Sequence, residues 1–348
     1  MNDTSPKLAL PAGLALPDLL QFDSGKPVTT AGQWQARREE VRHYILKMAY
    51  GEFPPVPQQT RCVVLHRAVV RLFGNAGLMT CRVETDGRAA FLLRIFVPTG
   101  QGPFAVVLNG DACWHYATDA VIAEVLARGC VFAHFNRLEI APDQNKGTAN
   151  LPHSTLAAWA WAHHRAVDAL YELDFVDRQH IAVVGHSRGG KAALLAGATD
   201  GRIALTCANN SGAGGAGCFR GQQAGAESLA DILRAYPHWF GPELAAFVGR
   251  ENDLPFDQHF LKALVAPRAL LTTEARGDVW ANPAGTLATH QAAQTVYALL
   301  GVPERIAIHF REGGHDHSYS DWCVFLEFCH QVFEAAEKPE HGQPMTET

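Results

Sequence analysis

Short apolar runs alternate along the chain with longer segments in which apolar residues recur at helical spacing. The short runs, which predict strands, lie at residues 61–72, 78–84, 90–97, 104–108, 130–135, 180–184, 203–208, 268–273 and 305–310. The longer segments, which predict helices, lie at residues 33–50, 117–127, 154–173, 189–198, 286–300 and 322–336. These two spacings are the main signals that separate strands from helices.

The order of these elements predicts the fold class. The first three strands follow one another directly, which is typical of antiparallel pairing, and from residue 104 onward strands alternate with helices. Such alternation implies parallel βαβ units, so we expect an α/β fold with a doubly wound, mostly parallel sheet and helices on both faces. We expect one domain at residues 31–338 with an insertion at about 218–260, a surface-wrapping segment at 1–30 and a disordered tail at 339–348.

Composition and charge exclude several classes of protein. The 348 residues are 47% hydrophobic and 18% charged, which is enough apolar material for a sizeable core. The net charge of -6 gives no basic footprint for nucleic acid, and no apolar run reaches membrane-spanning length. We therefore expect neither a nucleic acid nor a membrane as partner, and the sequence leaves the oligomeric state open.

The N-terminus and the cysteines bear on the cellular compartment. The first residues lack a basic stretch followed by an apolar one, and Pro11 and Pro17 interrupt them. None of the eight cysteines forms a Cys-x-x-Cys pair, which favours free thiols in a reducing compartment over a disulfide framework. We expect a cytoplasmic location for the chain as written, and a secreted or periplasmic one if a signal has been removed.

The strongest chemical signal is an apolar strand that runs into Gly-x-Ser-x-Gly and then into a helix. A serine at the tip of so sharp a turn needs small neighbours, which Gly185 and Gly189 provide. The turn exposes the hydroxyl of Ser187 and directs the backbone N–H of Arg188 toward a developing oxyanion. We therefore predict Ser187 as a nucleophile.

A nucleophilic serine needs a histidine base and a carboxylate that orients the base, and both follow later strands in this type of fold. Glu274 and Asp278 follow one such strand, and His315 and His317 follow the next. We favour His315 as the base because it directly follows a Gly-Gly turn, with His317 as a surface or supporting histidine. A zinc site built on the two histidines is the alternative, but the serine turn already explains the loop. No metal or cofactor is therefore expected, and His186 is predicted to be structural.

Seven motifs in a fixed order carry a resemblance to a known family. They are Ser-Arg-Gly-Gly-Lys at 187–191, Asn-Ser-Gly-Ala-Gly-Gly at 210–215, Tyr-Pro-His-Trp-Phe at 236–240, Leu-Pro-Phe-Asp-Gln-His at 254–259, Ala-Pro-Arg at 266–268, Asp-Val-Trp-Ala-Asn-Pro at 278–283 and Gly-His-Asp at 314–316. Together they resemble carbohydrate esterase family 15, the glucuronoyl esterases, especially its bacterial members. The resemblance implies an α/β-hydrolase that cleaves esters of glucuronic or 4-O-methylglucuronic acid, such as lignin–carbohydrate links.

The resemblance also implies roles for individual residues. Arg188 is similar to the arginine that stabilises the oxyanion in the family, and Lys191 and Glu227 are similar to groups that bind the sugar hydroxyls. Trp280 is similar to a tryptophan that contacts the sugar, and Arg220 is a weaker candidate for the same pocket.

The triad acid departs from part of the family. Some members carry it as Glu immediately before Ser-Gly-x-Gly-Gly, where this chain has Asn210. Other members place it after the later strand, so we assign Asp278, with Glu274 in reserve. Two alternatives stay open: another carbohydrate ester hydrolase such as an acetyl esterase, and a catalytically silent carbohydrate-binding relative.

Overall fold

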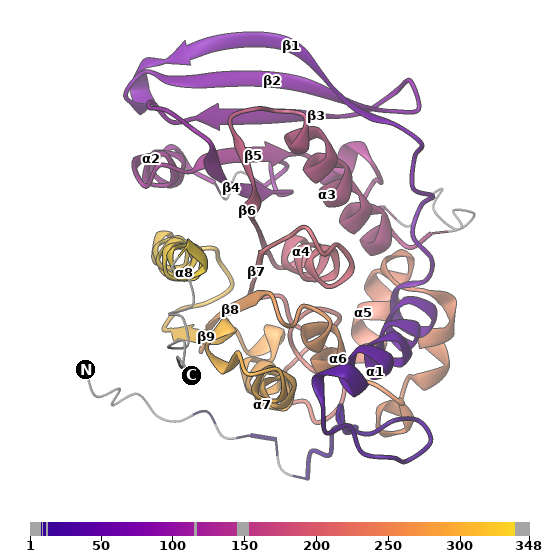
Figure 1. Cartoon of the computed structure of the whole chain (residues 1–348). Helices are drawn as coiled ribbons and strands as arrows, with labels where there is room; N and C mark the ends of the chain where they lie inside the picture. Colours follow the sequence, from indigo (N-terminus) through magenta and orange to yellow (C-terminus); the bar gives the residue numbers. More distant parts are fainter. Residues whose placement is uncertain (1–7, 9, 12, 115–116, 145–152, 338–348) are drawn as a thin grey trace, which may run out of the picture.

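The computed structural model describes residues 8, 10–11, 13–114, 117–144 and 153–337, and the predicted tail at 339–348 lies outside these residues (Figure 1). Within them, nine strands form one sheet in the order β1-β2-β3-β5-β4-β6-β7-β8-β9. The strands are β1 (Thr60–Val70), β2 (Ala76–Thr85), β3 (Arg88–Val97), β4 (Phe104–Asn109), β5 (Val131–Phe135), β6 (Val176–His186), β7 (Leu205–Asn209), β8 (Ala269–Ala275) and β9 (Ile306–Arg311).

The sheet is antiparallel at one end and parallel over the rest. Strands β1, β2 and β3 pair antiparallel, and β3 pairs antiparallel with β5. From β5 through β4, β6, β7 and β8 to β9, every neighbouring pair is parallel. Both the antiparallel start and the parallel remainder confirm the predicted fold class.

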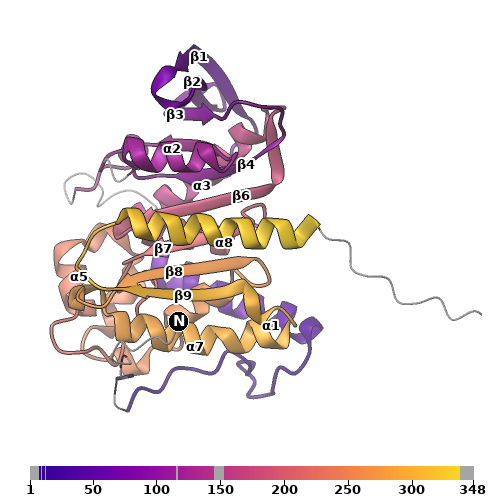
Figure 2. The same cartoon turned by 90° about the vertical axis from the view of Figure 1, so that its left-hand side faces the viewer.

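Helices cover both faces of this sheet (Figures 1 and 2). The helices are α1 (Ala31–Tyr44), α2 (Asp119–Ala127), α3 (Thr155–Tyr171), α4 (Arg188–Thr199), α5 (Leu229–Ala235), α6 (Gln258–Ala263), α7 (Pro283–Leu299) and α8 (Tyr319–Glu337). Apolar residues of α2 and α8 pack in one core layer, while those of α1, α3, α4, α6 and α7 pack in the other. Because helices bury the parallel part of the sheet on both faces, strands β4, β5, β7 and β8 are mostly apolar.

Some boundaries differ from those expected. The helix predicted at 33–50 ends as an α-helix at Tyr44 and continues as a π-helix over Ile45–Tyr50. Strand β6 begins before the apolar run at 180–184, because Val176 also pairs with Phe104 of β4. The polar residues Asp177, Arg178 and Gln179 lie in a register shift between this pair and the next one, Val106 with Ile181. The insertion contains α5 and the start of α6, which are seven and six residues long and therefore too short to show helical periodicity.

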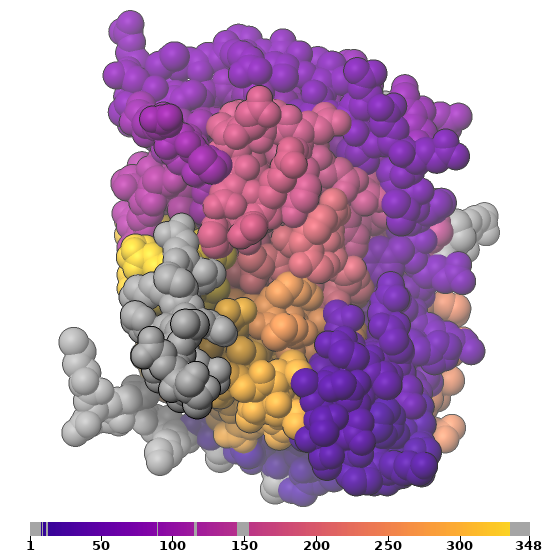
Figure 3. Space-filling view, in the orientation of Figure 1, coloured from indigo at the N-terminus to yellow at the C-terminus, as the bar shows by residue number. Residues whose placement is uncertain are grey.

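The N-terminal segment packs against the domain through apolar side chains. Residues Leu19 and Val28 of the N-terminal segment are buried, and Figure 3 shows the indigo surface of α1 at the lower right of the molecule.

All eight cysteines are free thiols. Among the described helices, none combines the length and the apolar character needed to cross a bilayer.

Candidate active site

A sharp turn between β6 and α4 carries Ser187. Its backbone has φ 54° and ψ -123°, a strained conformation for a residue with a side chain. The flanking glycines leave no room for a Cβ: one at Gly185 would lie 2.3 Å from the carbonyl oxygen of Gly189, and one at Gly189 would lie 1.8 Å from Asp111 Oδ1. The predicted serine turn is therefore present, and its glycines are sterically required.

Asp111, directly beyond the end of β4, supports this turn. Its Oδ2 accepts a hydrogen bond of 2.8 Å from the backbone N–H of His186, and its Oδ1 accepts one from the guanidinium of Arg137. Both side chains of this ion pair are buried. Asp111 was not among the predicted site residues, although its position at the carboxyl end of a parallel strand was a signal for it.

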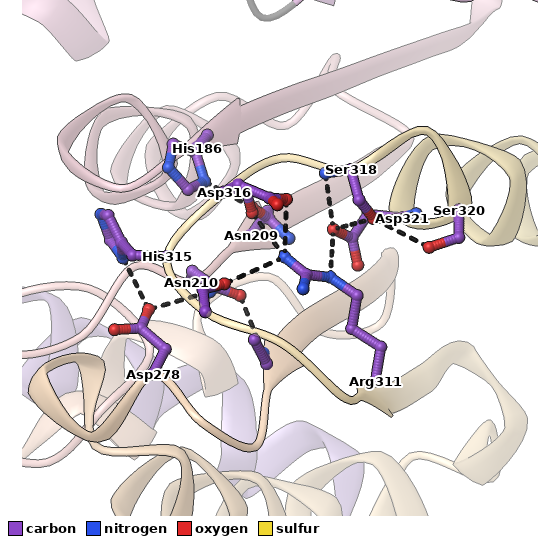
Figure 4. A network of polar contacts seen from close by, with 12 residues as sticks. His186, Asn209, Asn210, Asp278, Arg311, His315, Asp316, Ser318, Ser320 and Asp321 are labelled. Carbon is purple, nitrogen blue, oxygen red and sulfur yellow. Dashed lines mark hydrogen bonds and ion pairs between the residues drawn. The ribbon is translucent and has the colours of Figure 1, made fainter.

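The imidazole of His315 joins Ser187 to Asp278. His315 Nε2 lies 2.9 Å from Ser187 Oγ. His315 Nδ1 lies 2.6 Å from Asp278 Oδ2, the contact that Figure 4 shows. Asp278 is buried, whereas 42% of the His315 side chain is exposed. With a proton on Nδ1 held by the carboxylate, Nε2 is free to accept the hydroxyl proton. The structure thus brings together three predicted residues that are far apart in sequence.

The two candidate acids occupy different environments. Asn210 Nδ2 donates a 2.8 Å hydrogen bond to Asp278 Oδ2, and Asn210 Oδ1 accepts one of 3.0 Å from the Ala275 N–H. Glu274 is fully buried, and burial raises its pKa to about 8. Asp278, and not Glu274, is therefore the carboxylate that contacts the base, and Asn210 holds it rather than replacing it.

His317 is not a surface histidine, which corrects one of the two roles expected for it. It is buried, and its ring stacks on Trp322 with 4.5 Å between the ring centroids and on His186 with 5.7 Å. Burial holds the pKa of His317 well below its usual value, which favours the neutral ring. His186 is also buried, with Nδ1 2.5 Å from Asn209 Oδ1, as a structural residue would be. Across the described residues, no cluster of His, Cys, Asp and Glu is arranged to hold a metal ion.

A cavity of about 220 Å³ opens beside the serine. It is lined by Ser187, Arg188, Lys191, Asn210, Ser211, Gly212, Glu227, Tyr236, Trp239, Trp280, Ala281 and His315. The lining contains Ser187, His315 and Asn210, the last of which contacts Asp278. It also contains two cationic side chains, one carboxylic acid and three aromatic rings.

Arg188 is held in place at one wall of this cavity. Its guanidinium donates to the carboxylate of Asp143 and lies 5.0 Å from the ring centroids of both Tyr236 and Trp239. Asp143 also accepts a 2.7 Å hydrogen bond from Trp239 Nε1. A guanidinium fixed by a carboxylate and two rings needs little reorganisation when charge develops near it. The sequence analysis missed Asp143, while Tyr236 and Trp239 stood in a motif whose role it left open.

Lys191 and Glu227 lie together in the wall of the cavity. Lys191 Nζ donates to the carbonyl oxygens of Ser211 at 2.6 Å and Ala213 at 2.5 Å, and it lies 3.9 Å from Glu227 Oε2. Burial lowers the pKa of Lys191 to about 8 and raises the pKa of Glu227. Because two of the three N–H groups of the ammonium are taken by carbonyls, one remains for Glu227 or a ligand.

The other two predicted substrate-binding residues have different outcomes. Trp280 lies in the cavity lining with 52% of its surface exposed, as a ring that contacts a ligand at the rim would be. Arg220 is not among the residues that line this cavity. Its buried guanidinium is used by the carbonyl oxygens of Leu254 and Phe256, at 2.6 and 3.1 Å, and by the carboxylate of Asp257.

The chain is similar to known proteins in both sequence and structure. The sequence profile of the family described as "Glucuronyl esterase, fungi" matches residues 82–301. Carbohydrate esterase MZ0003, from an unknown prokaryotic organism, is 30% identical over 92% of this chain and 90% of its own length. A 4-O-methyl-glucuronoyl methylesterase of Thermothelomyces thermophilus is 32% identical over 87% of this chain and 76% of its own length. The solved structure of a glucuronoyl esterase from Solibacter usitatus has a TM-score of 0.85 and 27% identity, and covers 94% of this chain and 100% of that one.

Proposed function

The chain belongs to carbohydrate esterase family 15, the glucuronoyl esterases of the α/β-hydrolase fold, and we propose that it hydrolyses esters of glucuronic or 4-O-methylglucuronic acid. The observation that carries the proposal is the contact of His315 with both Ser187 and Asp278 beside a cavity that holds Arg188 and Lys191. The names of the relatives support the substrate class, since one of them is a 4-O-methyl-glucuronoyl methylesterase.

The proposed reaction is acyl transfer in two steps. His315 Nε2 takes the proton of Ser187 as Oγ forms a bond to the ester carbonyl carbon. The oxyanion is stabilised by the guanidinium of Arg188, which lines the cavity, and by the backbone N–H of Arg188 at the start of α4. His315 then gives the proton to the leaving alcohol as the ester C–O bond breaks. A water loses a proton to His315, attacks the acyl-enzyme and releases the uronic acid, and Ser187 regains its proton.

The cavity fits the acid side of such an ester. Lys191 supplies an N–H donor and Glu227 a carboxyl acceptor 3.9 Å away, a pair that can bind adjacent sugar hydroxyls. Trp280 offers an exposed ring at the rim, and apolar faces of a sugar ring pack on aromatic rings. A substrate that lacks hydroxyls could use neither the remaining N–H of Lys191 nor the carboxyl oxygens of Glu227, so its binding would lose those hydrogen bonds.

A hydrolysis screen with a matched inactive variant tests the proposal. Methyl and benzyl glucuronate, their 4-O-methyl forms and acetylated sugars would be compared for wild type and Ser187→Ala. We expect the uronate esters to be hydrolysed faster than the acetates, and the variant to lose activity on both. Preference for acetates would favour a sugar acetyl esterase instead. Absence of turnover, together with no labelling by a serine-reactive phosphonate, would favour a silent carbohydrate-binding relative.

A further inference from the structure

The loop that carries His315 has little packing of its own. Residues 312–316 between β9 and the buried His317 are all exposed, and Gly313 and Gly314 lie within this stretch. A Cβ added at Gly314 would meet nothing within 4 Å, so the loop is open on that side. Yet His315 has to keep both ring nitrogens within hydrogen-bond reach of Ser187 and Asp278. Since Gly313 and Gly314 allow many backbone conformations, another group has to hold residues 312–316 in the conformation that places His315 correctly.

Arg311, the last residue of β9, makes the contacts that select it. Its Nη1 donates to the carbonyl oxygen of Glu312 at 3.0 Å. Its Nη2 donates to the carbonyl oxygens of Gly314 at 3.3 Å and Asp316 at 2.7 Å, and to Asp316 Oδ1 at 2.9 Å. One guanidinium therefore binds the backbone on both sides of His315. Figure 4 shows it between Asp316 and Asp321.

Arg311 is itself anchored to the protein core. Its Nε donates a 2.7 Å hydrogen bond to Oδ2 of Asp321, whose side chain is fully buried. The same oxygen accepts from the backbone N–H of Ser318 at 2.9 Å and from Ser318 Oγ at 2.8 Å, at the start of α8. The exposed loop is thus fastened at one point to the buried start of a helix.

A second connection joins this loop to the one that carries the acid. The N–H groups of Arg276 and Gly277 donate to the carbonyl oxygens of Arg311, at 2.8 Å, and Gly313, at 3.1 Å. The loop that carries Asp278 is therefore hydrogen-bonded to the segment that Arg311 holds in place. A shift of this segment would change the separation of His315 from Ser187 as well as its contact with Asp278.

We propose that Arg311 is a positioning residue for catalysis, because its guanidinium fixes the loop conformation that presents His315 to Ser187. The inference rests on the proposed Ser–His–Asp function and adds a residue that contacts neither the substrate nor the triad side chains. A lysine cannot replace it, since a single ammonium cannot reach three carbonyl oxygens and two carboxylates that are bound by a planar fork.

Variants of Arg311 test this role. We expect Arg311→Ala and Arg311→Lys to lower kcat about 100-fold, the order of loss that a misplacement near 1 Å causes, with KM within about threefold. Added guanidinium at millimolar concentration is expected to restore part of kcat in Arg311→Ala. The matched control is Arg268→Ala. Arg268 is a partly buried arginine that also donates to backbone carbonyl oxygens, those of Asp200 and Ile203. It directly precedes the first residue of β8, at the end of that strand away from Asp278.

The outcomes separate positioning from stability. Melting temperatures of both alanine variants are measured first, and kcat is compared where both are folded. An Arg311→Ala enzyme with the kcat of wild type, a loss no larger than that of Arg268→Ala, or rescue no greater than in that control would each overturn the proposal. The kinetics use whichever ester the wild type hydrolyses, uronate or acetate, so failure of the proposed substrate class leaves this test intact.

Discussion

The carboxylate of Asp278 allows one quantitative prediction. Asp278 Oδ2 lies 2.6 Å from His315 Nδ1, which puts the centres of charge about 4 Å apart when the imidazole is protonated. At an effective dielectric constant of about 20, opposite charges at that distance attract by about 4 kcal/mol. Asp278→Asn keeps the size of the side chain but removes this attraction. Since about 1.4 kcal/mol corresponds to a factor of ten in rate, we expect kcat to fall about 1,000-fold.

Glu274→Gln is the matched control for this substitution. Glu274 is fully buried, and its pKa of about 8 means that its carboxyl is mostly protonated at pH 7. The control therefore changes almost no charge and no contact with His315. We expect its kcat to stay within about threefold of wild type, since no interaction with the imidazolium is lost.

The assay is initial-rate hydrolysis of benzyl glucuronate at pH 7, with circular dichroism and thermal melting to establish that both variants are folded. A folded Asp278→Asn enzyme that keeps more than a tenth of wild-type kcat would refute the reasoning. So would a Glu274→Gln enzyme that loses more activity than Asp278→Asn.

Three further predictions concern the serine turn and the cavity. Gly189→Ala places a Cβ 1.8 Å from Asp111 Oδ1, so we expect the free energy of unfolding to fall by about 3 kcal/mol or more; an unchanged urea midpoint would contradict this. Asp143→Asn removes the charged partner of Arg188, so kcat is expected to fall about tenfold with KM little changed; a rise in KM alone would point to substrate binding instead. Burial lowers the pKa of Lys191 to about 8, so its positive charge is present below that pH and lost above it. We expect kcat/KM for glucuronate esters to fall as pH rises through about 8, and a pH profile measured on Lys191→Met to lack this decline.

The linear order of the chain was enough to predict the fold class and the nucleophile. Both depend on local patterns. The fold class follows from strand and helix periodicity, and the nucleophile follows from the Gly-x-Ser-x-Gly motif, whose glycines allow the sharp turn that carries the serine. The resemblance to a family came from motifs that are contiguous in sequence, and it also supplied Lys191, Glu227 and Trp280, which line the cavity. Arg220, which the same resemblance suggested, is not in that lining, and a sequence motif does not tell which way a buried guanidinium points.

Only the tertiary structure decided which carboxylate faces the base. Glu274 lies within β8, whereas Asp278 lies in the turn that follows this strand. The side chain of Glu274 is therefore enclosed in the core, and that of Asp278 meets His315. The roles of Asn210 and Arg311 could not be predicted from the sequence either. Asn210 acts through a hydrogen bond to Asp278, which is distant in the chain, and Arg311 acts through hydrogen bonds to backbone atoms. Residue types and local spacing specify which chemistry is possible, whereas the packing of the sheet and its loops specifies which groups come within 3 Å of one another.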